Sequence, residues 1–248
     1  MENLYEMIFK RKSFRKFDKS LSISTVELEN IKERISSLQS LYPDINVKWE
    51  VVPITETSYK QGEYCILIYS EEKENYLLNI GYMFQELDLY LASINVGSCW
   101  HGIGKPKRKY HSNLEYIIMM VIGKVNELDF RSENTKIKRK NVSDVWYGAL
   151  TDVGEVVRYA PSACNGQPWY VEVDDETIKV FRIKKVKSIL LTLIGKKAQF
   201  YNKIDLGIFL LLLEIVLNKK GYIFEREIYP EIDVQELIPI ASYTYQKK

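Results

Sequence analysis

The sequence has only two histidines and three cysteines in 248 residues. The cysteines (Cys65, Cys99 and Cys164) are scattered and odd in number, so they form neither a zinc-ligand spacing nor a disulfide framework, and we expect a reducing, cytoplasmic setting. The histidines (His101 and His111) are too few and too close together to indicate a metal site. The sequence also lacks a Ser/His/Asp set, a paired-acid site and a phosphate-binding P-loop. We therefore expect no metal and no catalytic side chain of these kinds.

A strong net charge and a membrane-length apolar run are also missing. The formal net charge is +2, which argues against a dedicated nucleic-acid binder but leaves room for local clusters that bind a small anion. The most apolar run, residues 206–217, contains Glu214 and is too short to span a bilayer. The N-terminus has no apolar core of a signal peptide. We expect neither nucleic acid nor a membrane as a partner.

What the chain does contain is a mixture of helical and strand patterns. The content of hydrophobic residues is 46%, enough to fill a core, and the length allows one large domain or two small ones. Neither pattern dominates, so we predict an α+β fold. The predicted helices span residues 3–9, 22–38, 75–97, 152–160 and 203–218, and the predicted strands span residues 47–54, 64–70, 115–124, 169–175 and 177–183.

Two of these helices carry recognisable end signals. The helix in residues 22–38 begins with a capping box formed by Ser24 and Glu27. The helix in residues 75–97 is predicted to end at Gly97, a typical C-terminal cap. The following stretch, residues 97–105, has three glycines around Trp100. Glycines would let the backbone approach a flat ligand, or the stretch is a helix cap and a loop.

The two long helices suggest an internal repeat. Gly81 and Gly207 are 126 positions apart, about half the chain. Each lies near the start of a long apolar helix, and each helix follows two strand-like runs and an earlier helix. We predict two degenerate copies of one unit, in residues 1–125 and 126–248. The alternative is that a mixed fold simply has two long helices.

Two basic clusters are candidates for anion binding. Arg11, Lys12, Ser13 and Arg15 lie within five residues and could surround a phosphate with guanidinium, ammonium and hydroxyl donors. Residues 136–140, KIKRK, form a second basic run. Each cluster could instead be a solvated patch.

A third motif decides between these interpretations. Residues 160–169 read APSACNGQPW and, together with RKSFRKF at residues 11–17, they resemble the flavin-dependent nitroreductase family. The helix and glycine-rich loop in residues 79–102 and the strand and basic segment in residues 121–148 are also similar to that family. The resemblance covers most of residues 8–170. The loop motif, with seven defined positions in ten, is the most specific part.

The resemblance implies a nitroreductase-like fold with FMN as the cofactor. It assigns the FMN phosphate and ribityl chain to the first basic cluster, with charge added by the second. It places the backbone at His101 or Gly102 near flavin N5, and the 160–169 loop at the isoalloxazine ring. The implied cofactor-binding residues are Arg11, Lys12, Ser13, Arg15, Trp100, His101, Gly102, Arg139, Pro161, Ser162, Ala163 and Asn165.

The order of the motifs departs from the family pattern. In typical members the loop follows the basic opening by about 25 residues, but here it occurs only in the second half. We interpret the chain as a fused pseudo-dimer, in which two degenerate helix-flanked copies with antiparallel or mixed sheets supply one complete FMN site. A monomer would then suffice, and a higher oligomer is the alternative. A second site would need degenerate segments to replace the missing motifs.

These inferences predict an FMN-dependent NAD(P)H oxidoreductase. Hydride would pass from NAD(P)H through FMN N5 to a small electron-poor acceptor, such as a nitroaromatic or a quinone, in a ping-pong scheme. Such chemistry needs no protein nucleophile or general base. Two alternatives stay open: a flavin-binding protein for storage or sensing with little turnover, and a structural or regulatory protein without cofactor. No residues favour reductive dehalogenation or flavin breakdown, which also occur in the wider family.

Overall fold

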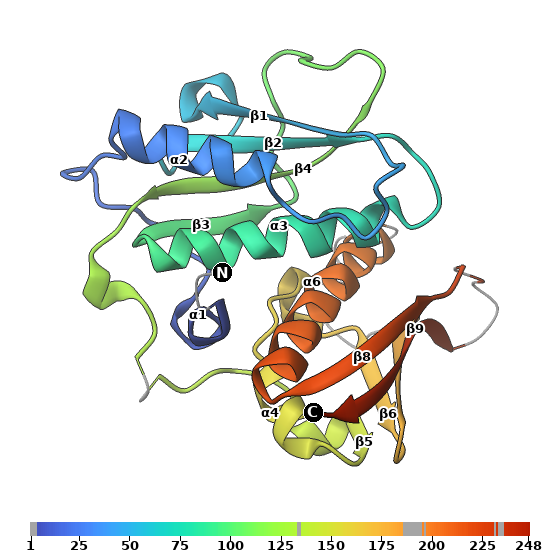
Figure 1. The fold of residues 1–248 in the computed structure, drawn as a ribbon. Helices are drawn as coiled ribbons and strands as arrows, with labels where there is room; N and C mark the ends of the chain where they lie inside the picture. The colour runs from blue at the N-terminus through green and yellow to red at the C-terminus, as the bar shows by residue number, and fades with distance from the viewer. Residues whose placement is uncertain (1–3, 133–134, 186–194, 196, 231, 233–235) are drawn as a thin grey trace. The chain divides into compact units, whose positions relative to one another are not determined.

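The chain combines helices and sheets in two compact units, which confirms the predicted α+β class (Figure 1). The computed structural model describes residues 4–132, 135–185, 195, 197–230, 232 and 236–248. Unit 1 consists of Met1–Tyr76 and Phe84–Thr135, and unit 2 consists of Leu77–Met83 and Lys136–Lys248. Because one short segment of the first half belongs to unit 2, the units are not the predicted copies, whose limits stay a prediction.

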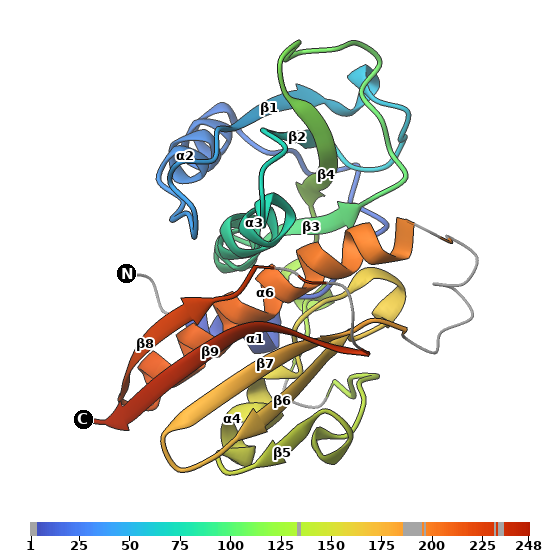
Figure 2. The same ribbon diagram turned by 90° about the vertical axis from the view of Figure 1, so that its right-hand side faces the viewer.

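Unit 1 is built on a four-stranded sheet. The strand order is β1 (Val47–Pro53), β2 (Tyr64–Ser70), β4 (Glu115–Lys124) and β3 (Val96–His101), and all neighbouring strands are antiparallel. The helices are α1 (Leu4–Lys10), α2 (Thr25–Ser36) and the part of α3 (Tyr76–Ser93) that belongs to this unit. Figure 2 shows α2 and α3 on one face of the sheet. Short 3₁₀ helices span Ile54–Glu56 and Glu127–Asp129.

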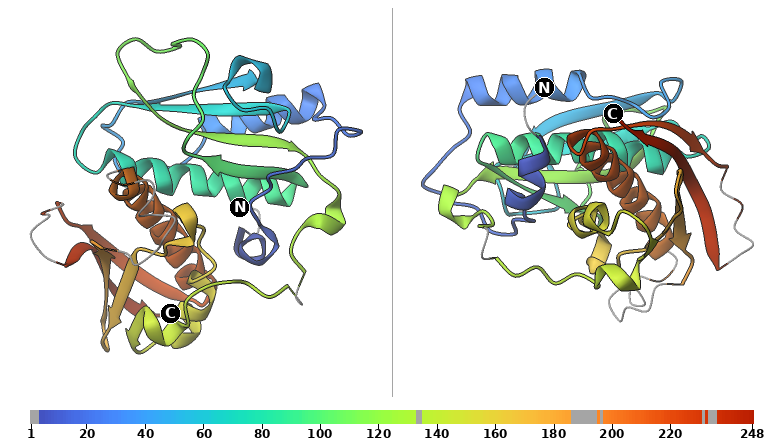
Figure 3. Two further views of the ribbon diagram at one scale, coloured as in Figure 1. Left: turned by 180° about the vertical axis from the view of Figure 1, so that it is seen from behind. Right: turned by 60° about the horizontal axis from the view of Figure 1, so that its bottom comes forward.

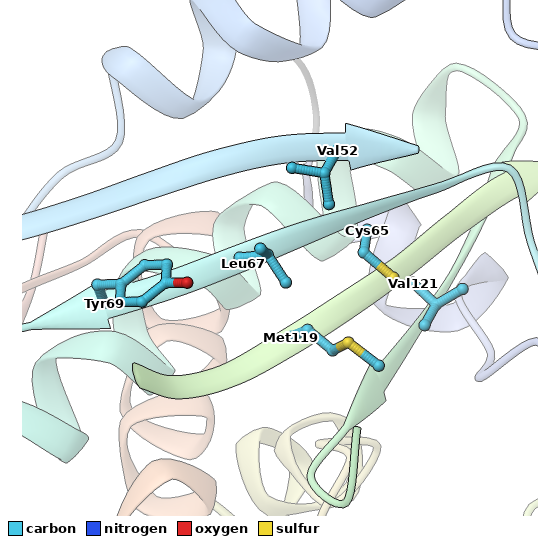
Figure 4. Close-up of a cluster of buried hydrophobic side chains, with 6 residues drawn as sticks. All are labelled: Val52, Cys65, Leu67, Tyr69, Met119 and Val121. Carbon is cyan, nitrogen blue, oxygen red and sulfur yellow. The ribbon is translucent and has the colours of Figure 1, made fainter. Parts of the chain in front are cut away.

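The opposite face of this sheet carries a hydrophobic cluster (Figure 4). Alternate positions of the strands point to it, as the two-residue period of a strand requires. Its buried members are Val52, Cys65, Leu67, Tyr69, Met119 and Val121. Since the intervening residues of β2 and β4 are also buried, both faces of the central strands are covered, which explains their nearly continuous apolar sequence.

The predicted capping box at the start of α2 is confirmed. Ser24 Oγ accepts a hydrogen bond from the Glu27 amide at 3.3 Å, and Glu27 Oε2 accepts one from the Ser24 amide at 2.9 Å. Glu27 Oε1 also pairs with the Lys124 ammonium group at the end of β4. The bonds from Lys124 and from the Ser24 backbone lower the pKa of Glu27 to about 2. The box therefore links the helix to the sheet as well as capping it.

Loss of this link gives a testable pH dependence. We expect Glu27→Gln to lower the free energy of unfolding by about 1 kcal/mol at pH 7; this figure is discounted for solvent screening, since the side chain is 31% exposed. Because the folded-state pKa is lowered, the contribution is complete above the usual value of 4.5 and is lost as the pH falls toward about 2. Urea unfolding at pH 7 and pH 3 measures it. Glu29→Gln, at an exposed pair with Lys32, is the control, and equal losses in both variants would contradict the prediction.

Unit 2 is built on a five-stranded mixed sheet. The strand order is β5 (Trp146–Gly148), β6 (Trp169–Val173), β7 (Thr177–Ile183), β9 (Leu237–Lys247) and β8 (Tyr222–Ile228). β5 is parallel to β6, and the other neighbours are antiparallel. The long helix α6 (Lys197–Lys219) contacts β7, β8 and the short helix α4 (Thr151–Val157). Figure 3 shows α6 lying alongside the sheet of this unit. Short 3₁₀ helices span Val142–Asp144 and Ala163–Asn165.

The two sheets share one strand order. In each, a hairpin of two strands is followed by a long helix and a second hairpin, whose last strand inserts beside the second strand. In each sheet, the second strand of the first hairpin has a register shift where it pairs with the inserted strand. The shift lies between Ile68 and Tyr69 in β2, which pairs with β4, and between Val180 and Phe181 in β7, which pairs with β9. The unit 2 sheet differs by the added strand β5.

Two glycines allow a close helix crossing within unit 2. Leu77–Met83, the first turns of α3, belongs to this unit and meets α6 there. A Cβ atom on Gly81 would lie 2.0 Å from the Ile204 carbonyl oxygen, and one on Gly207 would lie 1.9 Å from the Leu78 carbonyl oxygen. The two backbones are therefore in direct contact, which only glycine permits. The glycines are those whose spacing suggested the repeat.

The predicted end of the first long helix at Gly97 is wrong. α3 ends at Ser93, and Asn95 adopts the left-handed conformation with φ 56°. Residues 96–101 then form β3, which pairs with β4 along its whole length. Gly97 serves packing instead, since a Cβ atom there would lie 2.7 Å from the Val125 side chain. The glycine-rich run resembled a loop because its strand character comes from pairing rather than from propensity.

Candidate functional site

The sequence-predicted site residues fall into two groups, one in each unit. The first group comprises the basic segment after α1 and the residues around the end of β3, all in unit 1. The second group comprises Arg139 and the 161–167 loop, by which we mean residues 161–167 before β6, all in unit 2.

The basic segment runs along β3, the edge strand of the unit 1 sheet. Ser13 forms a parallel bridge with Ser98, and the Phe14 amide donates to the Ser98 carbonyl oxygen at 2.9 Å. The Arg11 amide still bonds to the last turn of α1, at the Met7 carbonyl oxygen. The helix end and the strand edge together fix the path of the segment. The structure thus brings its backbone alongside the strand that carries Trp100.

Arg11 is held by a buried ion pair. Its Nε donates to Asp88 Oδ2 of α3 at 2.6 Å, and the two side chains are 3% and 0% exposed. Asp88 Oδ1 also accepts from the Ser98 hydroxyl, and Arg11 Nη2 donates to Ser13 Oγ at 3.2 Å. Asp88 was not predicted, because on the sequence it is one acidic residue in a helix. Its effect is to fix the direction of the Arg11 guanidinium group.

Successive side chains of β3 point to opposite faces of the sheet, so the candidate residues on this strand lie on two different faces. Ser98, which bonds to Asp88, and Trp100 lie on one face of the sheet, and His101 lies on the other, opposite Met119. The Trp100 Nε1 atom is buried and has no hydrogen-bond partner among the residues that the structure describes. A buried donor without an acceptor in the protein calls for a partner, such as a bound water or a ligand.

His101 is the last residue of β3 and packs against an aromatic ring. Its imidazole lies 4.1 Å from the Tyr59 ring, centroid to centroid, at an angle of 38°. Burial lowers the pKa of His101, and the charge of Arg15 lowers it further. The imidazole is therefore neutral at pH 7, and its side chain does not face the Asp88 side of the strand. Gly102 follows in the adjoining turn.

The two remaining cations of the predicted cluster, Lys12 and Arg15, differ in setting. Arg15 is exposed, and its charge acts on Cys99 and His101. The Lys12 ammonium group lies over the Phe14 ring, 4.7 Å from its centroid. The members of the predicted cluster of four therefore differ in exposure: Arg11 is buried and oriented, whereas Arg15 is exposed.

In unit 2, the structure brings Arg139 and Asn165 into contact. Arg139 Nη1 donates to Asn165 Oδ1 at 2.6 Å, and Asn165 Nδ2 donates to the Lys138 carbonyl oxygen at 3.0 Å. Both ends of the Asn165 amide thus bond to the basic run at residues 136–140. The two predicted features are parts of one local structure.

Gln167 joins the same structure and was not among the predicted residues. Its Oε1 accepts from the Lys140 amide at 2.9 Å, and its carbonyl oxygen accepts from Lys140 Nζ at 2.9 Å. The Gln167 amide donates to Ser162 Oγ at 3.0 Å, which closes the loop on itself. The signal was present, because this glutamine is one of the defined positions of the loop motif.

The backbone of the 161–167 loop is strained. Cys164, Asn165 and Gln167 have φ values of 51°, 55° and 50°, in the left-handed region. Each such residue other than glycine costs about 1 kcal/mol, and such residues cluster at binding and active sites. The hydrogen bonds from the 136–140 run hold this conformation.

No described helix is long and apolar enough to cross a membrane. Within the same described part of the chain, no group of three or more His, Cys, Asp or Glu residues could hold a metal ion.

Comparison with known proteins identifies the family. Residues 3–216 match the family described as "Putative TM nitroreductase". Because the match covers most of the 248 residues, the chain belongs to this nitroreductase family, which indicates an oxidoreductase. A comparison with curated proteins finds no match.

The chain is also similar to several solved structures. A putative nitroreductase from Thermotoga maritima has a TM-score of 0.62 at 18% identity, with 98% of this chain and 93% of that chain covered. A putative NADH dehydrogenase/NAD(P)H nitroreductase from Parabacteroides distasonis has a TM-score of 0.42 at 13% identity, covering 55% of this chain and 95% of that chain. A putative NADH oxidase from Clostridium acetobutylicum has a TM-score of 0.36 at 17% identity, covering 56% and 96%. The first match confirms the nitroreductase-like fold.

Proposed function

We propose that this chain is an FMN-dependent NAD(P)H oxidoreductase that reduces a small electron-poor acceptor such as a nitroaromatic or a quinone. Membership of the nitroreductase family supports the reaction class. The observation that carries the cofactor assignment is the arrangement in unit 1, where an oriented arginine and a buried unpaired indole donor lie along one strand edge. Bound FMN would supply the redox chemistry, accepting hydride at N5 from NAD(P)H and passing it to the acceptor in ping-pong order.

The donors of unit 1 fit the phosphate and ribityl chain of FMN. Arg11 uses Nε for Asp88, while Nη1 has no hydrogen-bond partner among the described residues and is left to bind an anion. Ser13 adds a hydroxyl group, and Lys12 and Arg15 add positive charge. Asp88 does not bind FMN in this proposal. Its carboxylate orients the Arg11 guanidinium group, so that less rotamer entropy is lost on binding.

Candidate ring-binding residues occur in each unit, and each set is proposed from its own motif. In unit 1 we propose Trp100 and the backbone at His101 and Gly102. In unit 2 we propose the 161–167 loop, with Arg139 orienting the Asn165 amide. The ring-binding residues of the loop are Pro161, Ser162, Ala163 and Asn165. No side chain is assigned as a general acid or base, and the neutral His101 imidazole is not needed as one.

We further propose that the chain is a fused pseudo-dimer with one complete set of motifs. The shared strand order and the matching register shifts support two copies of one unit. The basic opening occurs only in the first half and the loop motif only in the second. One FMN per chain is the expected stoichiometry, and a monomer would be sufficient.

Flavin counting tests this proposal. We expect the purified 29.1 kDa protein to be yellow, to release about one FMN per chain, and to lose its visible absorbance when NADH or NADPH is added without oxygen. Arg15→Gln should raise the Kd for FMN about tenfold, as expected for loss of a charge-assisted hydrogen bond. Lys19→Gln, an exposed cation nearby in the sequence, is the control.

Other outcomes would correct the proposal in defined ways. FMN that stays oxidised with both nicotinamides would indicate a flavin-binding protein for storage or sensing. A protein that binds no FMN after reconstitution would remove the cofactor assignment. Two FMN per chain would show that a second site exists.

A further inference from the structure

A buried carboxyl group on α6 contacts the 161–167 loop. Asp205 is 4% exposed, and both of its carboxyl oxygens accept from the Ala163 amide at 3.0 Å. Ala163 opens the short 3₁₀ helix of the loop and directly precedes the strained residue Cys164. The contact is therefore made where the backbone enters its unusual conformation.

An apolar residue at position 205 would be more favourable for the stability of the protein than an aspartate. The surrounding run of α6, residues 204–213, is otherwise apolar and buried. Asp205 forms no ion pair within the described part of the chain. A carboxyl group buried without a cation is unfavourable, and burial raises the pKa of Asp205 well above its usual range. The hydrogen bond to the loop is the one compensating contact that the structure shows.

The loop is held from two directions within unit 2. The basic run at residues 136–140 binds the side chains of Asn165 and Gln167. α6 binds the backbone at Ala163 through Asp205. A strained segment persists only where its surroundings fix it. Removal of either support should therefore release the loop while the sheets remain intact.

We propose that Asp205 is a positioning residue, which fixes the 161–167 loop through the Ala163 amide in the conformation that receives the flavin ring. The part of this inference that concerns flavin rests on the proposed function above. The part that concerns the loop does not. For this role, residue 205 needs one hydrogen-bond acceptor for the Ala163 amide, on a side chain as long as that of aspartate. Asparagine meets that demand through Oδ1, whereas alanine does not.

Hydrogen exchange without flavin tests the positioning role. Exchange of amides in a peptide spanning residues 159–170 would be followed by mass spectrometry in wild type, Asp205→Ala and Asp205→Asn. We expect the alanine variant to exchange about tenfold faster, as expected for one lost hydrogen bond, and the asparagine variant to stay within about threefold of wild type. Glu214→Gln is the control, because it alters another buried acid of α6 that bonds to Tyr82 and Tyr243 and not to the loop.

FMN titration of the same proteins tests the link to the site. We expect the alanine variant to bind FMN about tenfold more weakly with a shifted absorption maximum, and the asparagine variant to restore both. The Glu214→Gln control should leave the absorption maximum unchanged. A merely structural role for Asp205 would not move the spectrum of the bound flavin.

The outcomes separate this inference from the proposed function. Unchanged exchange in a folded alanine variant would overturn the positioning role. If the alanine variant does not fold, the Asp205→Asn variant provides the test. Fast exchange of the loop in that variant would also overturn the positioning role. If wild type binds no FMN but the exchange results are as expected, the proposed function fails and the positioning of the loop stands.

Discussion

Gly207→Ala is expected to destabilise the protein by about 3 kcal/mol, at the upper end of the range for overpacking a core. The added methyl group would lie 1.9 Å from the Leu78 carbonyl oxygen and 2.7 Å from the Tyr82 amide nitrogen. These are backbone atoms of a helix and cannot move like a side chain. The helices must separate, which would remove contacts along the crossing. Urea unfolding followed by circular dichroism measures the change.

Gly154→Ala is the matched control for this substitution. Gly154 is also helical and buried, but its added Cβ would meet side-chain atoms of Trp146 and Val142 at 2.8 Å. At this distance a neighbour must move, but side chains move more easily than helix backbone, so we expect a smaller loss, of about 1–2 kcal/mol. Gly81→Ala should behave like Gly207→Ala. If Gly207→Ala is no worse than the control, the crossing is not as close as described.

The buried ion pair of unit 1 is expected to have the second large effect. Asp88→Leu should lower the free energy of unfolding by about 3–5 kcal/mol, because it leaves the Arg11 guanidinium group buried without its counter-charge. It also removes the acceptor of the Ser98 hydroxyl group. Arg11→Met should be comparably destabilising, since it leaves the Asp88 carboxylate buried without its counter-charge.

The double variant Arg11→Met/Asp88→Leu separates stability from binding. With both charges removed, much of the lost stability should return, giving a coupling energy of about 2 kcal/mol or more in the double-mutant cycle. Its affinity for FMN should nevertheless stay reduced, because the proposed phosphate donor is gone. Strictly additive losses of stability would contradict a direct interaction between the two side chains. Full FMN affinity in the double variant would remove Arg11 from the proposed site.

The sequence predicts local structure and motifs well in this protein. The α2 capping box was recognisable because its two residues are three positions apart. The long helices were recognisable from their apolar runs, and the spacing of Gly81 and Gly207 suggested a repeat, although the helix crossing at these glycines was not predicted. The family resemblance is confirmed by the match over residues 3–216. These features depend on neighbours in the chain or on fixed spacings.

The contacts that were missed join segments far apart in the sequence. Asp88 meets Arg11 across 77 positions, and Asp205 meets Ala163 across 42. No periodicity indicates such a pair. β3 was assigned to a loop because glycine, serine and cysteine have no strong preference for strands, and pairing with β4 overrides this. The roles proposed for the cofactor-binding residues stay predictions.

The close helix crossing also has a consequence for the order of folding during synthesis. Gly81 leaves the ribosome long before Gly207, which is 126 residues later, and the first turns of α3 have their partner only when α6 has been made. Contacts between residues so distant in sequence form late and slow the folding of a domain. The first turns of α3, Leu77–Met83, carry apolar side chains that stay uncovered in the meantime, and such surfaces promote aggregation. Completion of α6 therefore supplies the partner that covers these turns, while the unit 2 sheet still waits for β8 and β9.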